Sequence, residues 1–119
     1  VIEPEYDDDI DYSTDYSGYY TSGRGEMYIS GDPSHYFVTV NWSSSAFETS
    51  TWTFTGVFDS SGTLSFSDCS RVTNTYYEDG TSDFTTDYTD ASGSLSIVGA
   101  SGFLWEVYGD GDISGTVFQ

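Results

Sequence analysis

Acidic side chains are the most abundant groups in this sequence that could carry out acid–base chemistry. The 119 residues include 20 aspartates and glutamates but only two basic residues, Arg24 and Arg71. Paired carboxylates serve as acid and base in many hydrolases, and the candidates here are Glu48, Asp68 and Glu106. Because no motif sets any two of these groups at a catalytic separation, a carboxylate hydrolase is only a minor alternative.

Asp68 is the carboxylate with the clearest structural prediction. It continues the alternation of Leu64 and Phe66, so its side chain is expected to point inward. A buried carboxylate requires a partner, which Arg71 or Arg24 could supply. The alternative is a bulge that turns Asp68 outward. Either structural role is favoured over catalysis.

Two acid-rich turns resemble fragments of calcium-binding loops. They read Gly109-Asp110-Gly111-Asp112 and Glu78-Asp79-Gly80. A complete EF-hand loop has more oxygen ligands and a terminal glutamate at fixed spacing, so both segments are first of all hairpin turns. Asp110 and Asp112 are the candidate ligands for weakly bound calcium, and no other cofactor is predicted.

The single cysteine, Cys69, excludes an internal disulfide. A catalytic thiol needs a neighbouring base, and His35 is the only histidine. We therefore expect Cys69 to be a small buried hydrophobe. His35, which has no second imidazole or thiolate pattern beside it, is expected to be a surface strand residue. No nucleophile elbow, phosphate-binding loop or dinucleotide fingerprint is present.

The net charge limits the partners that this protein can have. The formal net charge is −18, and the chain has no lysine. Binding to nucleic acid or to an anionic membrane depends largely on Lys and Arg, so both are excluded. No stretch is long and apolar enough to span a bilayer. A solvated acidic surface is the plainest interpretation, with a cationic partner or divalent ions as alternatives.

The segment 51–69, TWTFTGVFDSSGTLSFSDC, is the clearest element that could position these groups. Its period of two predicts a hairpin with one buried face. A three-residue loop, residues 60–62, sets Phe58 opposite Leu64 and keeps the large apolar residues on one face. It also places Gly62 where a turn followed by a bulge requires positive φ.

The remaining chain divides into an acidic N-terminal arm or linker, 1–17, and a β-domain, 18–119. Strands are expected near 18–20, 24–30, 35–42, 72–77, 95–97, 103–107 and 113–118. The turn at 31–34 is predicted to pair Ser30 with His35, and a loop at 79–81 to pair Tyr76 with Phe84. Residues 43–50 are predicted to form a loop, and 90–93 and 99–101 to form turns.

Eight or nine short strands joined by tight turns, without a helical window, predict an all-β antiparallel meander closed into a small barrel. The ends would meet where Tyr19 and Tyr20 approach Val117 and Phe118. A Greek-key β-sandwich is the second choice. The many inward aromatic residues favour a filled interior over a ligand cavity. If the barrel holds a ligand, Trp42, Trp52 and Trp105 are its expected walls.

The strand patterns resemble those of uncharacterised small secreted or lipid-anchored β-barrel proteins of Gram-positive bacteria, which are lipocalin-like in outline. The matching segments are Tyr36-x-Val38-x-Val40-x-Trp42, Trp52-x-Phe54-x-Gly56-x-Phe58, Gly62-x-Leu64-x-Phe66 and Phe103-x-Trp105. The lipocalin Gly-x-Trp signature is absent, since Gly18-Tyr19-Tyr20 has tyrosine in its place. The resemblance implies an extracellular or cell-surface anchored protein and no catalytic residues. An acidic cytosolic protein from a salt-loving organism is the alternative.

Together these patterns predict a non-catalytic extracellular binding module. One alternative is an inhibitor or decoy for a cationic protein such as lysozyme, or for a basic peptide, motivated by the charge. The other is a carrier of a small apolar ligand.

Overall fold

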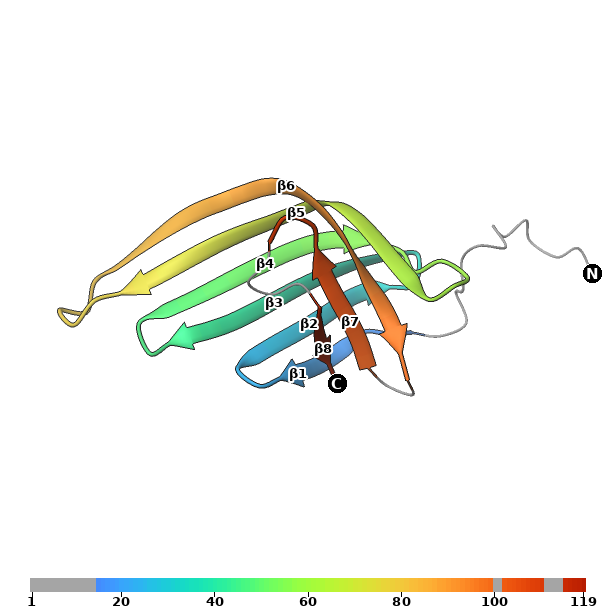
Figure 1. Cartoon of the computed structure of the whole chain (residues 1–119), viewed down its shortest axis with the longest axis horizontal. Helices are drawn as coiled ribbons and strands as arrows, with labels where there is room; N and C mark the ends of the chain where they lie inside the picture. Colours follow the sequence, from blue (N-terminus) through green and yellow to red (C-terminus); the bar gives the residue numbers. More distant parts are fainter. Residues whose placement is uncertain (1–14, 100–101, 111–114) are drawn as a thin grey trace, which may run out of the picture.

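The protein folds as an eight-stranded antiparallel meander that forms a nearly closed barrel (Figure 1). This description rests on a computed structural model and covers residues 15–99, 102–110 and 115–119. The strands are β1 Gly18–Ser22, β2 Gly25–Asp32, β3 His35–Ser45, β4 Glu48–Gly56, β5 Thr63–Tyr76, β6 Ser82–Val98, β7 Gly102–Val107 and β8 Thr116–Phe118. The predicted all-β meander barrel is thereby confirmed.

The barrel closes where its first strand meets the end of the chain. The backbone N–H of Thr21 donates to the carbonyl of Gln119 over 3.0 Å, and the N–H of Gln119 donates back to Thr21 over 2.9 Å. The contact lies close to the predicted one between the Tyr19-Tyr20 and Val117-Phe118 pairs. Closure removes the free edges that these two strands would otherwise expose.

The barrel interior is filled by buried hydrophobic side chains from all strands except β1. The rings of Trp52 and Trp105 pack 5.2 Å apart, edge to face, and Phe54 stacks on Phe66 at 4.1 Å. The core consists of Met27, Ile29, Tyr36, Val38, Val40, Trp52, Phe54, Phe58, Leu64, Phe66, Cys69, Leu95, Phe103, Trp105, Val107 and Phe118. This set agrees with the period-two alternation of the sequence.

The hairpin between β4 and β5 has the predicted loop. Phe58 bridges Leu64, and Gly62 has φ of +82°. The carboxylate of Asp59 accepts hydrogen bonds from the N–H groups of Ser61 and Thr63 over 2.9 and 3.1 Å. The Ser61 hydroxyl also donates to this carboxylate over 2.6 Å. This bond first, and then the two backbone bonds, lower the pKa of Asp59, and together they fix the loop geometry.

A bulge in β5 turns Asp68 outward. Phe66 pairs with Gly93, but the next pairs are Cys69 with Ala91 and Arg71 with Tyr88, so the inward parity changes between Phe66 and Cys69. Asp68 instead accepts hydrogen bonds from the backbone and hydroxyl of Thr55 on the outer face. The bulge alternative is confirmed, and an inward ion pair of Asp68 with Arg71 is wrong.

Two predicted registers are wrong by two residues. In the β2–β3 hairpin Asp32, rather than Ser30, pairs with His35, because the Asp32 carboxylate accepts from the N–H of Ser34 and leaves only two residues in the loop. In the β5–β6 hairpin the loop is 78–80, with Gly80 at φ of +87°, and Tyr76 pairs with Ser82 rather than Phe84. A shift of two residues leaves each side chain on its expected face.

Two predicted breaks are continuous strand. Residues 43–50 lack alternation because they extend beyond the core, yet β3 and β4 run through them to a turn at Ala46 and Phe47. Residues 90–93 lie within β6, where Gly93 allows the strands to approach closely: a Cβ there would lie 2.1 Å from the Glu106 carbonyl. Of the predicted 99–101 turn only Gly99 is described, with φ of +64°. Ile113, the predicted start of the last strand, also lies outside the described residues.

The last residues of the predicted N-terminal arm pack against one end of the barrel. The Tyr16 ring lies 4.9 Å from that of Phe58 and 6.0 Å from that of Phe103. The N–H of Tyr16 donates to the Tyr36 hydroxyl over 2.9 Å, and the Tyr20 hydroxyl donates to the Tyr16 carbonyl over 2.7 Å. Tyr16 therefore covers this end of the core.

Candidate functional site

The opposite end of the barrel continues into a projecting sheet, which we call the sheet extension and define as residues 43–49 and 74–87. β2 reaches only to the Gly25–Trp42 pair, so the later residues of β3 continue without it. The hairpin of β5 and β6 extends furthest (Figure 1). Its side chains are largely exposed, in keeping with their Thr- and Asp-rich sequence.

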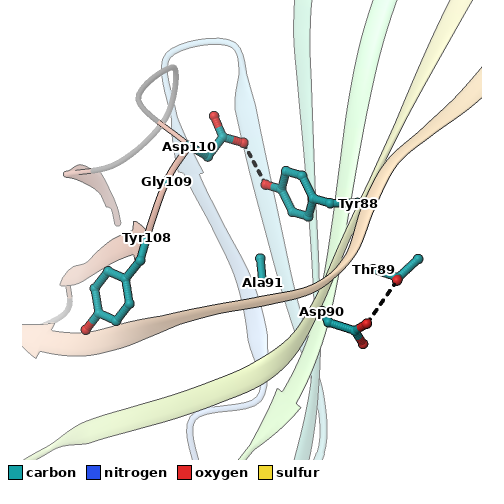
Figure 2. A pocket seen from close by; sticks show the side chains of 7 residues that line it. All are labelled: Tyr88, Thr89, Asp90, Ala91, Tyr108, Gly109 and Asp110. Carbon is teal, nitrogen blue, oxygen red and sulfur yellow. Dashed lines mark hydrogen bonds between the residues drawn. The ribbon is translucent and has the colours of Figure 1, made fainter.

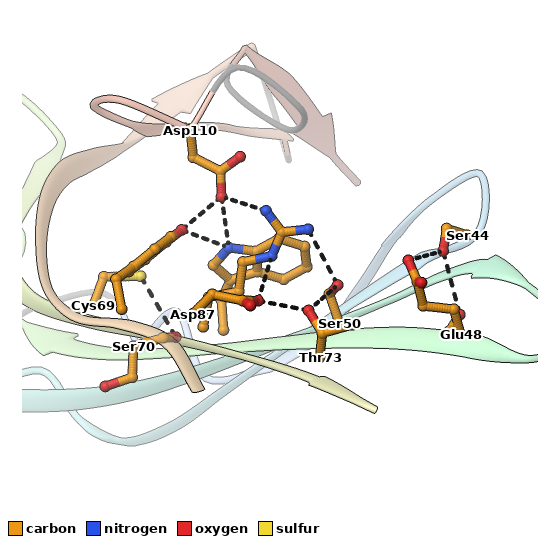
Figure 3. Close-up of polar contacts among 11 residues, drawn as sticks. Ser44, Glu48, Ser50, Cys69, Ser70, Thr73, Asp87 and Asp110 are labelled. Atoms are coloured by element: carbon orange, nitrogen blue, oxygen red, sulfur yellow. Dashed lines mark hydrogen bonds and ion pairs between the residues drawn. The ribbon is translucent and has the colours of Figure 1, made fainter. Parts of the chain in front are cut away.

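A network centred on Arg71 joins this extension to the barrel through Ser50, Asp87 and Asp110, which are labelled in Figure 3. The guanidinium group lies 4.8 Å from the centre of the Trp52 ring. Nη1 donates to Oδ2 of Asp110 over 3.0 Å, Nη2 donates to Oγ of Ser50 over 3.3 Å, and Nε lies 3.4 Å from Oδ2 of Asp87. Arg71 therefore contacts β4, β6 and the segment after β7.

Asp110 is the acceptor on which this network converges (Figure 3). Besides Arg71, its Oδ2 accepts from the Tyr88 hydroxyl over 2.6 Å and from the Trp52 indole N–H over 3.3 Å. The Asp110 side chain is 5% exposed and that of Arg71 18%. Since the carboxylate faces a cation and two further donors, it is stabilised as the anion.

Two neighbouring titratable groups, Tyr88 and Cys69, are held in their neutral forms. Burial, followed by the hydrogen bond to Asp110, raises the pKa of Tyr88 well above its usual value. Burial and the negative charges of Asp68 and Asp110 raise the pKa of Cys69 to about 12. A thiol with this pKa carries almost no thiolate at neutral pH. The Arg71 network is therefore suited to holding the segment after β7 in place.

A pocket of about 430 Å³ lies beside this network, between β6 and the segment after β7 (Figure 2). Its lining residues are Tyr88, Thr89, Asp90, Ala91, Tyr108, Gly109 and Asp110. Asp90 and Asp110 are its two carboxylates, but Asp110 is already bound by Arg71. Asp90 is exposed and lies beside the hydroxyl of Thr89, which donates to it over 3.4 Å.

The three predicted ligand-binding tryptophans are placed differently from one another. Trp52 and Trp105 are 1% and 0% exposed and belong to the packed core. Trp42 is half-buried, lies over Gly25 and meets the Phe118 ring edge-on at 6.3 Å. The indole N–H of Trp105 has no hydrogen-bond acceptor among the described residues.

The candidate catalytic groups are dispersed. Glu48 accepts from the Ser44 hydroxyl over 3.0 Å on the sheet extension, Asp68 binds Thr55, and Glu106 lies on β7 between two buried residues. His35 is exposed at the start of β3, whereas Cys69 is buried in β5.

The predicted calcium ligands are only partly described. Asp110 is in the Arg71 network, and Asp112 lies outside the described residues. Within residues 15–99, 102–110 and 115–119, no group of three or more His, Cys, Asp or Glu side chains could hold a metal ion.

The roles of Arg71, Tyr88 and Asp87 in one network were not predicted. The sequence alone indicates Arg71 only as a possible partner for Asp68. The sequence contains one signal for its role in the network: Arg71 follows Cys69 by two residues, so the two side chains lie on the same face of β5 once the bulge is known. The partnership with Asp110 joins positions 39 apart in the chain, and such a contact leaves no local pattern.

Comparison with known protein families, with curated proteins and with solved structures finds no match to this chain. Within the described part of the chain there is no helix that is long and apolar enough to cross a membrane.

Proposed function

We propose that this protein is a non-catalytic β-barrel binding module whose sheet extension binds a cationic protein or basic peptide. The observation that carries the proposal is the distribution of charge around the two arginines. Arg71 is neutralised by Asp87 and Asp110, and Arg24 donates to the carbonyl of Ser44. In the described part of the sheet extension there is no further basic residue to balance its exposed carboxylates, Glu48, Glu78, Asp79 and Asp83.

The sheet extension also exposes aromatic side chains, which are enriched at protein interfaces. Phe47 is 53% exposed, Tyr76 44%, Tyr77 48% and Phe84 73%. Aromatic area beside uncompensated negative charge suits a partner with basic and apolar groups. The filled barrel interior and the engagement of Asp110 by Arg71 both favour this function over an apolar ligand carrier or a hydrolase.

We further propose that the protein acts outside the cell or anchored at its surface, where basic proteins such as lysozyme are accessible partners. An origin in a salt-loving cytosol predicts unfolding at low ionic strength instead. A melting temperature that stays within a few degrees between 10 mM and 1 M salt supports the extracellular proposal, and unfolding at 10 mM contradicts it.

Binding to lysozyme, measured by calorimetry at 50 mM and 500 mM salt, tests the function. We expect binding at the lower salt that weakens at least tenfold at the higher, because exposed charges are screened within about 10 Å at 0.1 M salt. The variant Glu48→Gln/Glu78→Gln/Asp83→Asn is expected to lose at least tenfold in affinity. Its matched control, Glu26→Gln/Asp90→Asn/Glu106→Gln, removes the same charge elsewhere and is expected to lose less than threefold. Absence of binding, or equal losses in the two variants, contradicts the proposal.

A further inference from the structure

The backbone of β6 along residues 82–87 has no partner strand on its outer side within the described chain. β6 pairs with β5 on one side along this stretch. On its other side β7 pairs only with residues 93–98, and the N–H of Tyr108 donates to the carbonyl of Ser92. Among the described residues, no strand pairs with 82–87 on that side. We call this stretch the free edge.

The alternation of hydrogen-bonded and non-hydrogen-bonded pairs between β5 and β6 identifies the backbone groups of β6 that face outward. The N–H of Tyr77 donates to the carbonyl of Thr81, which marks a hydrogen-bonded pair. In an antiparallel ladder such pairs alternate with non-bonded ones, so Asp83 and Thr85 bond to β5. The N–H and C=O groups of Ser82, Phe84 and Thr86 therefore point away from β5, ready to pair with an added strand.

The side chains of the free edge differ between its two faces. Asp83 accepts from the Tyr77 hydroxyl over 3.1 Å, and Asp87 from the Thr73 hydroxyl over 2.6 Å, on the face that continues the barrel interior. Phe84, which lies on the opposite face, is 73% exposed. A strand added here would meet carboxylates on one face and an aromatic ring on the other.

Charge decides which strand can occupy the free edge. A second copy pairing through β6 would set its own aspartates against Asp83, Asp87 and Asp90, and like charges across strands are destabilising. The chain's residues 1–14 have carboxylates and no basic residue. An extended basic segment of another protein complements the edge.

We infer that the free edge of β6 binds an extended basic peptide by antiparallel strand addition. This inference rests on the proposed function and specifies its binding mode. The peptide sets lysine or arginine opposite Asp83 and Asp87, and an apolar residue opposite Phe84. Its residues opposite Ser82, Phe84 and Thr86 exchange backbone hydrogen bonds with β6.

The peptide Ser-Lys-Thr-Thr-Val-Lys-Ser, capped at both ends, follows this register with its lysines opposite Asp87 and Asp83 and its valine opposite Phe84. One derivative carries N-methyl groups on the valine and on the first threonine, whose N–H groups would bond to Phe84 and Thr86. The matched control carries one on the second threonine, opposite Thr85, whose N–H points away from β6. All three peptides have the same charge.

We expect calorimetry at 50 mM salt to show that the doubly methylated peptide binds at least tenfold more weakly than the parent. The control peptide should stay within threefold. Equal affinity of all three peptides, or a β6-mediated dimer seen by sedimentation at rising protein concentration, overturns strand addition. If the parent peptide fails while lysozyme still binds in a salt-sensitive manner, only strand addition is overturned. If neither the parent peptide nor lysozyme binds, the proposed function is overturned together with strand addition.

Discussion

Replacing Asp110 with asparagine is expected to destabilise the barrel by about 3 kcal/mol, the lower end of the cost of removing one partner from a buried ion pair. The Asp110 side chain is 5% exposed, and its Oδ2 receives Arg71, Tyr88 and Trp52. The lower end applies because Arg71 is 18% exposed and retains Asp87 at 3.4 Å. For a domain of this size the loss lowers Tm by about 10 °C.

Urea unfolding and thermal unfolding of Asp110→Asn, each followed by circular dichroism, measure this loss. Asp90→Asn is the matched control, because Asp90 is an exposed carboxylate in the same pocket, and it should change stability by less than about 0.5 kcal/mol. Adding Arg71→Met to Asp110→Asn should cost far less than the two single losses together, since the uncompensated guanidinium is removed. Equal effects of the Asp110 and Asp90 variants, or an additive double variant, would refute the role of the Arg71 network.

Three further predictions concern the core and the hairpin loops. Gly93→Ala should destabilise the protein by about 3 kcal/mol in urea unfolding, because the new Cβ would lie 2.1 Å from the Glu106 carbonyl. Ser92→Ala, at an exposed neighbouring position, is the control. Similar stabilities of the two variants would contradict the close approach of the strands at Gly93. Cys69, whose pKa is raised to about 12, should resist a thiol reagent at pH 8 until the protein unfolds; rapid labelling of the native protein would contradict its burial. The pKa of Asp59 is lowered from 3.8 in the folded state, so the ionised carboxylate stabilises the protein above pH 3.8 and this effect is lost as the pH falls through the folded pKa. The stability difference between wild type and Asp59→Asn should therefore shrink between pH 6 and pH 2. A constant difference would argue against this linkage.

The local alternation of apolar residues was sufficient to predict the faces of the strands, except in β5 after Phe66, where the bulge reverses them. The hairpin from Trp52 to Leu64 has its predicted loop, because only one loop length keeps the large apolar residues together. The registers of β2–β3 and β5–β6 were wrong by two residues, since a shift of this size leaves every side chain on its face and the pattern cannot detect it. The side chain of Asp32, which accepts from the N–H of Ser34, decides the first of these registers.

The site was harder to predict than the fold. Arg71 and Asp110 meet only because the bulge after Phe66 reverses the facing of β5, and a bulge adds one residue without a sequence signature of its own here. The part of the sheet extension formed by β3 and β4 was predicted as a loop at 43–50, because residues 43–49 have no buried face and lack the alternation that identifies a strand. Trp52 and Trp105 were predicted correctly as inward residues, but their aromatic character alone did not distinguish a core from a pocket wall.

The free edge of β6 connects the acidic composition to a specific binding surface. Negative charge is a common protection of exposed sheet edges against self-association. In this protein the charge that excludes a second copy is the same charge that complements a basic strand, with Asp83 and Asp87 on one face and Phe84 on the other. The backbone hydrogen bonds of the edge would then fix the direction and register of the bound strand, and the carboxylates would select a partner of positive charge.

Amide hydrogen exchange, followed by NMR before and after addition of the parent basic peptide, shows directly whether the peptide adds as a strand to the free edge of β6. We expect the amides of Ser82, Phe84 and Thr86, which face the free edge, to gain protection at least tenfold, while those of Asp83 and Thr85, already bonded to β5, change little. Peptide binding that leaves these outward amides unprotected, or that spreads small changes evenly over the acidic surface, would contradict strand addition.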